Sequence, residues 1–538
     1  MPSAVHVANQ LSELSLVDLT ELLLARPTQL GRQRDLHDVA DALLATDSIT
    51  ATLRSLSRRS LTSLADGHAD ADAVGLALAD RDGKPYPEVR ALLPAIGDEP
   101  IPTEPATAPT DASTMLHTVG ALRDLLAWIA EEPLPMSATG GVLKAEEKTL
   151  ALGLVIPESE SHIVVWIAER TGFARTVDRR LRITAAGKAA LDNLDELWSV
   201  AVDSVLTELP RTVLSQIRDA RRLDRAFCEW VWPMRDTAGK RTLDSVLRAV
   251  DMLGLVAGAT TDCGRAVLSA DDTALRAIRA TVFPALLDSV YVLDDLSVIA
   301  PGPISTTTAT ALDSVSVIET RGLASKRRLD PARILRSITE GSTVESLLET
   351  LGAHSLTPLT SAVVSTVTDI ATNTRFVSLN GTGTDTAAKA SHPELGALLL
   401  VDPRLQRLAP VGVDAVTVLY GASRDRVETA LIEGRYTVVS AERPVPVADP
   451  TPPSPLIDLA EDLHRVGLGS THLERALLMA GKARARVTLV VDTATGPRTI
   501  TLEPRHVANG RVRGLDTGSD VERTLPISAI LELKAVGE

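Results

Sequence analysis

The chain has 538 residues, of which 44% are hydrophobic and only 2% aromatic, and its formal net charge is −15 at pH 7. This length is too great for a single hydrophobic core and predicts about three to five domains. The acidic balance argues against a protein that binds polyanions over its whole surface. The few aromatic rings leave little on which unpaired bases could stack.

Two features bear on the compartment. The cysteines, Cys228 and Cys263, lie in a chain without a recognisable signal peptide, so we expect two reduced thiols in the core. No apolar run reaches the ~18 residues that a helix needs to span a bilayer, and no basic segment opens the chain. The sequence therefore predicts a soluble, cytoplasmic protein.

Residues 1–93 are predicted to form a helical N-terminal domain. Leucines recur at helical spacing from Leu11 to Leu23, and Arg26-Pro27 ends the helix because proline disfavours helix in its predecessor. Prolines mixed with Thr, Ala and acids then mark residues 94–113 as a linker.

Residues 114–200 have the pattern of a winged-helix-like domain. Helical stretches precede a turn at Gly172, two short strand patterns and a Thr-x-x-Gly that ends at Gly187. Four arginines fall on the strand pair, where they could lie along phosphates and position the protein without reading sequence. These candidate DNA-binding residues are Arg175, Arg179, Arg180 and Arg182. Winged helices also bind proteins, so both uses stay open.

Residues 201–284 resemble a second, degenerate winged-helix domain with almost no wing. A helical pattern over 243–252 runs into Leu253-Gly254-Leu255. We expect Trp230 and Trp232, just upstream, to pack in the core rather than to stack on bases.

Residues 285–442 are predicted to form a small α/β domain. Strands are expected at 290–299, 314–318 and 323–329. Helix starts are expected at Asp330-Pro331 and, with capping-box spacing, at Ser342–Glu345. Candidate DNA-binding residues on the basic strand and before it are Arg321, Lys326, Arg327 and Arg328.

Four phrases in this domain carry a resemblance to a known family. They are Asp295-Leu296, Pro301-Gly302-Pro303, Arg321-Gly322 and Leu356-Thr357-Pro358-Leu359. Their order over residues 291–378 resembles the N-terminal domain of XPB-type DNA-repair helicases, in the form found in bacterial helicase-associated proteins. Residues 24–30 also resemble the opening of that family. The resemblance implies a domain that docks to partner subunits and approaches damaged duplex DNA.

A second proline-rich linker, residues 443–455, precedes a helix and a β-rich segment at 456–538. Strands are expected at 487–491, 497–502, 511–515 and 527–533, with turns at Asn509-Gly510 and Thr517-Gly518. The layout resembles WYL domains, which are small SH3-like barrels that sense ligands or nucleic acid. It departs from them at the naming motif, where this chain has Arg-Val-Arg. Candidate DNA-binding residues here are Arg484, Arg486, Arg511 and Arg513.

The basic residues gather in three windows of an otherwise acidic chain. Residues 170–188, 321–336 and 482–513 each carry a local net charge of +5. Arginine supplies 46 of the 55 cations, and its planar fork suits phosphate. The alternative is that acids elsewhere in the fold balance these windows.

The motifs of a helicase motor are missing from this sequence. Gly187-Lys188 and Gly239-Lys240 are the nearest approaches to a phosphate-binding loop, and both lack the upstream glycine at the required offset. Asp294-Asp295 is therefore interpreted as turn or edge residues rather than a magnesium site. The ten histidines show no metal-binding spacing, and neither cysteine has a neighbouring histidine. We expect no enzyme activity, no metal and no cofactor.

The sequence thus predicts an α+β multidomain protein: a helical N-terminal region, winged-helix-like modules, a small α/β domain like the XPB N-terminal domain, and a C-terminal SH3-like β-barrel. The function it favours is a non-catalytic, helicase-associated protein that binds double-stranded DNA, docks to an XPB-type DNA-repair helicase, or does both. The alternatives are a winged-helix/WYL-type transcriptional regulator and a pure protein-interaction scaffold. No membrane partner is expected.

Overall fold

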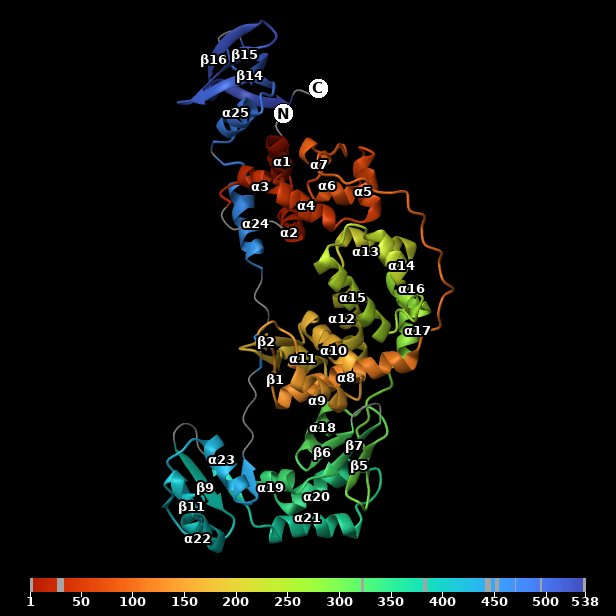
Figure 1. Ribbon diagram of the computed structural model, residues 1–538, viewed down its shortest axis with the longest axis vertical. Helices are drawn as coiled ribbons and strands as arrows, with labels where there is room; N and C mark the ends of the chain where they lie inside the picture. The colour runs from red at the N-terminus through yellow and green to blue at the C-terminus, as the bar shows by residue number, and fades with distance from the viewer. Residues whose placement is uncertain are drawn as a thin grey trace.

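The computed structural model describes residues 3–26, 33–320, 324–380, 385–440, 447–449, 454–469, 471–493 and 496–535. Over these residues the protein is an elongated α+β molecule, about half helical, with four separate small sheets (Figure 1). The mixed α+β class is confirmed. No single described helix is long and apolar enough to cross a membrane. The helices Lys144–Leu154 and Glu158–Arg170 reach the necessary length and apolar character only when they are taken together, and this pair is bent by 89° at the break between them.

The N-terminal residues form a helical bundle around leucine side chains. Its helices are α1 (Ser3–Ser12), α2 (Leu16–Ala25), α3 (Leu36–Leu43), α4 (Thr46–Arg54), α5 (Arg58–Ala65), α6 (Ala71–Gly75) and α7 (Pro87–Arg90). Ser15, Asp35 and Ser57 cap α2, α3 and α5 by accepting first-turn N–H groups. The much later helix α24 (Pro455–Val466) packs on α2 and adds Ala460 and Leu463 to this core.

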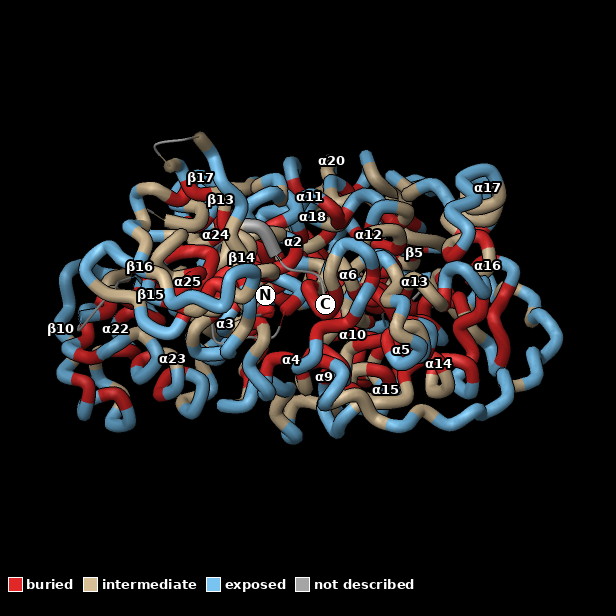
Figure 2. The backbone as a smooth tube through the Cα atoms, turned by 90° about the horizontal axis from the view of Figure 1, so that it is seen from above, coloured by how far each residue is buried: buried red, intermediate tan, exposed pale blue. Residues whose placement is uncertain are grey.

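The segment that follows α7 is extended and mostly exposed as it passes along the outside of the central helices (Figures 1 and 2). It is held by specific contacts. Glu104 pairs with Arg265 at 2.6 Å, and the N–H of Ala108 donates to the carbonyl of Thr260 at 3.2 Å. This linker is therefore attached to the body beside it.

The central body is built on one hydrophobic core that runs from Met115 to Val282. Its helices are α8 (Ala112–Glu131), α9 (Lys144–Leu154), α10 (Glu158–Arg170), α11 (Ala185–Ala190), α12 (Leu194–Leu206), α13 (Arg211–Ala220), α14 (Arg225–Val231), α15 (Thr237–Met252), α16 (Asp262–Leu268) and α17 (Asp272–Val282). Strands β1 (Leu134–Pro135), β2 (Ala174–Val177) and β3 (Arg180–Ile183) form an antiparallel sheet in the order β1-β3-β2. Cys228 and Cys263 are free and buried in this core, which confirms the expectation for both thiols.

An antiparallel sheet with the order β4-β5-β7-β6 begins the predicted α/β region. Its strands are β4 (Tyr291–Val292), β5 (Ser297–Ala300), β6 (Ser316–Thr320) and β7 (Ser325–Leu329). Its helices are α18 (Thr306–Asp313), α19 (Pro331–Thr339), α20 (Val344–Ala353) and α21 (Ser361–Asn373). The single strand predicted at 290–299 is wrong. Asp295 accepts hydrogen bonds from the N–H and hydroxyl of Ser297 and turns the chain between β4 and β5.

Two helix starts in this region test the capping predictions. Asp330 accepts from the N–H of Arg333, and Pro331 occupies the first turn of α19, as predicted. The capping box of α20 lies one residue later than predicted: Thr343 and Ser346 exchange the two hydrogen bonds.

A second sheet follows, in the order β10-β11-β9-β8-β12, with β12 parallel to β8. Its strands are β8 (Val377–Asn380), β9 (Thr386–Ala390), β10 (Val411–Gly412), β11 (Thr417–Tyr420) and β12 (Val438–Ser440). It is accompanied by α22 (Pro393–Val401), the 3₁₀ turn η1 (Gln406–Leu408) and α23 (Arg424–Glu433), with a core of its own.

The C-terminal sheet does not close into the predicted SH3-like barrel within the described residues. Helix α25 (His472–Lys482) packs on β14. The other elements are β13 (Val487–Val491), β14 (Arg498–Ala508), β15 (Arg511–Asp516), β16 (Val521–Pro526), η2 (Ile527–Ala529) and β17 (Ile530–Ala535). The order is β16-β15-β14-β13-β17, so β16 and β17 lie at opposite edges. Alternating apolar residues occur in open and closed sheets alike, so the pattern did not distinguish them.

Candidate nucleic-acid interface

The β2–β3 hairpin gathers four arginines of the first basic window. Arg175 lies opposite Arg182 in the strand register, and Val177 lies opposite Arg180. Because side chains alternate along a strand, Arg175, Arg180 and Arg182 share one face. Ala174, Leu181 and Ile183 on the other face are buried.

The tip of the hairpin is a tight turn at Asp178 and Arg179. Both residues have positive φ, 51° and 58°, which is the twist that joins antiparallel strands with a two-residue loop. Arg179 and Arg180 are exposed. The carbonyl of Arg179 accepts the N–H of Met136 at 2.8 Å and so fixes the tip against the segment after β1.

The facing pair of arginines makes the hairpin suited to an anion. Like charges directly opposite each other on a sheet destabilise it, and a bound anion relieves the repulsion. The buried Nε of Arg182 has no hydrogen-bond partner among the described residues. Arg175 and Arg182 are half-buried, so the exposed positive charge of the hairpin comes from Arg179 and Arg180.

Residues 447–449 of the second linker lie beside this hairpin. The N–H of Ala448 donates to the carbonyl of Ile183 at 2.8 Å, and Arg175 Nη1 donates to the carbonyl of Asp449 at 3.1 Å. Thr184 and Ala448 form a parallel bridge. Residues 447–449 thus lie against the base of the hairpin, and Arg179 at its tip is exposed.

Three cations of the second basic window pair with acids of the same sheet unit. Lys326 and Arg328 on β7 both pair with Glu319 on β6, the first at 3.2 Å. The hydrogen bond from Arg328 lowers the pKa of Glu319. Arg327 is buried and pairs with Asp313 at the end of α18. The alternative of a balanced face therefore describes these three cations, and Arg321 lies outside the described residues.

The third window lies on the C-terminal sheet. Arg484 and Arg486 are exposed just before β13, and Arg511 and Arg513 are exposed on one face of β15. Arg513 pairs with Glu522 at 2.7 Å. Figure 1 shows this sheet at one end of the molecule, the β4–β7 sheet toward the other end, and the β2–β3 hairpin between them. The three windows therefore do not form one continuous surface.

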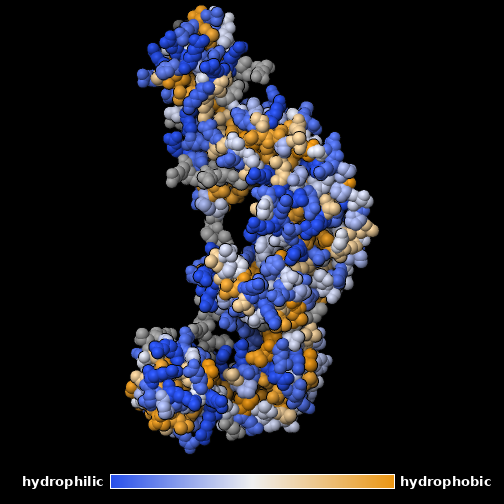
Figure 3. Space-filling model, in the orientation of Figure 1, coloured by the Kyte–Doolittle hydropathy of each residue, from blue (hydrophilic) through white to orange (hydrophobic). Residues whose placement is uncertain are grey.

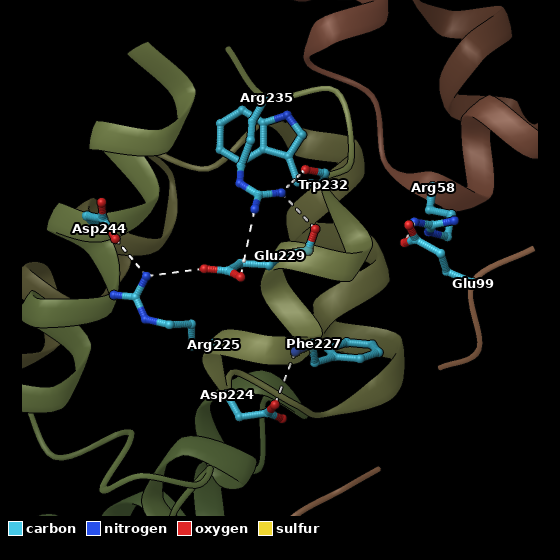
Figure 4. Close-up of polar contacts among 9 residues, drawn as sticks. All are labelled: Arg58, Glu99, Asp224, Arg225, Phe227, Glu229, Trp232, Arg235 and Asp244. Atoms are coloured by element: carbon cyan, nitrogen blue, oxygen red, sulfur yellow. Dashed lines mark hydrogen bonds and ion pairs between the residues drawn. The ribbon is translucent and has the colours of Figure 1, made fainter. Parts of the chain in front are cut away.

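The tryptophans near α14 have structural partners. Trp232 is buried, and its ring N–H donates to the carbonyl of Arg54 at 2.6 Å; Trp230 packs at the edge of the same core. Core packing is confirmed for both. Figure 4 shows the polar contacts beside them: Arg225 reaches Glu229 and Asp244, and Arg235 donates to carbonyls of the same turn.

Sequence reasoning missed a cavity of about 370 Å³ where α8 meets α18, β6 and β7. Its lining comes from segments far apart in the chain, so no local pattern announces it. The described residues contain no group of three or more His, Cys, Asp or Glu placed to hold a metal ion.

One comparison with known proteins bears on function. Residues 290–412 match a family model described as "Helicase conserved C-terminal domain". The match runs from the start of β4 to the end of β10 and falls on the segment whose phrases resemble helicase-associated proteins. No curated protein matches the chain. The match supports a helicase-associated protein, while the XPB type and the WYL likeness stay predictions.

Proposed function

We propose that this is a non-catalytic, helicase-associated protein that binds duplex DNA through the β2–β3 hairpin and docks to an XPB-type DNA-repair helicase. The family match at residues 290–412 supports the association with helicases. The DNA proposal rests on one observation: Arg175, Arg180 and Arg182 share a hairpin face, with Arg179 at the tip.

The order of elements around the hairpin supports a winged-helix reading. Helix α8, strand β1, helices α9 and α10, and strands β2 and β3 follow in the order typical of that module. In helix-turn-helix proteins the second helix reads base edges with its first residues. Here that helix is α10, and its first turn carries Glu158 and Glu160, which phosphates and most base edges repel. We therefore propose contact through the hairpin without sequence preference.

A charge-reversal titration tests DNA contact by the hairpin. The double variant Arg179→Glu, Arg180→Glu should weaken binding of a fluorescent duplex by about tenfold or more, because two phosphate contacts become repulsions. Fluorescence anisotropy at low salt measures it.

The matched control is Arg34→Glu, Arg211→Glu, an equal change of charge at exposed arginines of the N-terminal bundle and of α13. It should leave the affinity within a factor of about two, because only long-range charge changes. Equal losses in both variants would reject hairpin contact.

The docking proposal has a candidate surface at the edge of the second sheet. Val411 on the edge strand β10 is 60% exposed, and Val401 at the end of α22 is 68% exposed. Leu398 and Val413 beside them are also exposed, and Gly412 lies against Leu400 of α22. Figure 3 shows apolar atoms on this part of the surface. An exposed apolar edge of this kind is typical of an interaction site.

A pull-down with a purified XPB-type helicase tests this surface. Leu398→Asp with Val401→Asp should abolish capture of the helicase and leave DNA binding unchanged. Val17→Asp, at an apolar residue of α2 that is 66% exposed, is the control and should capture the helicase normally. Failure of the unaltered protein to capture the helicase would overturn docking without touching the DNA proposal.

The two alternatives make different predictions. A winged-helix/WYL-type regulator would be a dimer with a preferred operator, and competition by unrelated duplexes would then be weak. A pure scaffold would show no DNA binding even at low salt. The acidic start of α10 favours the proposed function over the regulator.

A further inference from the structure

The cavity beside Arg327 lies between two parts of the molecule. One wall is α8 of the central body. The other is formed by α18, β6 and β7 of residues 290–412, which match the helicase family model and are called the helicase-matched segment below. Its volume of about 370 Å³ is in the range of small-molecule sites, about 300–1,000 Å³. Much of the wall is apolar, with Leu116, Ala127, Leu191, Ile304 and Ile318 among the lining residues.

The acids that line the cavity already have partners. Asp313 accepts from Arg327 Nη1, and Glu131 pairs with Arg333 at 3.4 Å. Asp124 also has an interaction within the described structure. The carboxylates therefore leave little capacity to attract a cation.

Two cations of the lining, Arg327 and Lys188, keep unused donors. Arg327 is 5% exposed, and its Nε has no hydrogen-bond partner among the described residues. Lys188 lines the same cavity, is exposed, and has no ion pair within the described part of the chain. A buried N–H without an acceptor is unfavourable, so a ligand oxygen at Arg327 would be stabilising.

The net charge of the cavity lining indicates the charge of the ligand that fits it. The lining carries three cations, Arg123, Lys188 and Arg327, and three acids, Asp124, Glu131 and Asp313. A singly charged head group suits a lining that is neutral in sum better than a dianion does. We propose that this cavity binds a small monocarboxylate with an apolar body, whose head group accepts from Arg327 Nε near Lys188 and whose body lies against α8.

Such a ligand would bind at the interface between the central body and the helicase-matched segment. Arg123 on α8 donates to the carbonyl of Ile304, and Asp192 accepts the N–H of Thr306 at 2.6 Å. A molecule between α8 and β7 adds contacts to both sides and favours this relative placement by its differential affinity for it. The site therefore couples ligand binding to the position of the helicase-matched segment. It does not depend on DNA binding.

Calorimetric titration of the full chain with octanoate, and with the neutral octanamide, tests the proposal. Octanoate should bind at one site, and octanamide about tenfold more weakly or worse, because a hydrogen bond to a charged group is lost. Lys188→Gln should weaken octanoate binding. Arg328→Gln, next to Arg327 on β7 but outside the cavity lining, should leave it unchanged.

A second variant guards against misfolding. Gly120 lines the cavity from within α8, and a Cβ added there meets open space. Gly120→Leu should therefore fold, since leucine favours helix over glycine, and should fill the cavity and abolish binding. Binding that survives Gly120→Leu, equal binding of octanamide, or no binding of octanoate at millimolar concentration would each overturn the proposal.

Discussion

Arg26 is a cation that the N-terminal bundle buries almost completely. Arg26 is 2% exposed. Its guanidinium donates three hydrogen bonds: to the carbonyl of Leu76 at 3.0 Å, to the carbonyl of Leu43, and to the hydroxyl of Ser48. Burial lowers its pKa to about 10. In the sequence Arg26 marks only the helix end before Pro27. Its acceptors come from later helices and turns, so its burial could not be predicted.

Replacing Arg26 tests how much this buried residue holds the bundle together. Arg26→Met should lower the free energy of unfolding of the bundle by about 2–4 kcal/mol, because two carbonyls and a hydroxyl lose their donor inside the core. Native-state hydrogen exchange of α2 measures it. Arg34→Met, at a side chain that is 82% exposed, is the control and should change protection little. Equal protection in both variants would contradict the structural role.

The cations of the basic strand β7, like Arg26, have partners on other elements that no local sequence pattern predicts. The sequence predicts DNA binding by the three described candidates on β7, and the structure places all three in ion pairs. Their partners, Glu319 and Asp313, lie on neighbouring elements, and tertiary packing decides which cations they balance. The β2–β3 arginines differ because the turn and register that align them are local.

At the scale of elements, short-range signals were predictable and long-range pairing was not. The Asp330-Pro331 start of α19 depends on one side chain and its own backbone, and it was predicted correctly. The strand β16 was missed, because Glu522 and Arg523 interrupt its apolar pattern and its pairing with β15 supplies the order. The open order of the C-terminal sheet depends on which edges meet, which no local pattern encodes.

The contact between α3 and α25 joins opposite ends of the chain and contains a histidine pair. His37 Nε2 and His472 Nδ1 lie 2.9 Å apart, and Arg475 pairs with Asp35 and Asp38 beside them. Burial, together with His472 and Arg475, lowers the pKa of His37 from 6.5 to about 4. Burial also lowers the pKa of His472. The contact therefore favours neutral rings.

This contact should weaken in acid. The folded pKa of His37 lies below its unfolded value, so the unfolded or undocked state binds the proton first. Stability is then fully present above pH 6.5 and is lost as the pH falls toward about 4. Burial raises the pKa of Asp38, but hydrogen bonds from Arg475 and Arg34 lower it from 3.8 to about 2. The stability that this carboxylate contributes is therefore kept above pH 3.8 and is lost only as the pH falls from there toward about 2.

Small-angle scattering can follow the docking of α25. The radius of gyration should increase as the pH falls from 6.5 toward 4, because the C-terminal sheet is released from the bundle. The double variant His37→Leu, His472→Leu has no ring to protonate and should stay docked over that range. A radius independent of pH in the unaltered protein would contradict this account of the contact.

At the scale of the whole molecule, charge and shape restrict where DNA can bind. The chain carries a net charge of −15, and its three basic windows lie on separate parts of an elongated structure (Figure 1). In the second window, Lys326, Arg327 and Arg328 pair with Glu319 and Asp313. A contact confined to the β2–β3 hairpin would therefore involve few phosphates and be sensitive to salt.

The salt dependence of duplex binding tests the central claim most directly. Four arginines on phosphates predict a slope of log K against log salt of about −3.6, since each contact contributes about −0.9. The variant Arg179→Ala, Arg180→Ala should reduce the slope to about −1.8, because two of the four phosphate contacts are lost. Neither the variant nor the unaltered protein should prefer one duplex sequence over another. A slope that the variant does not change, or no binding at low salt, would contradict DNA contact through the hairpin.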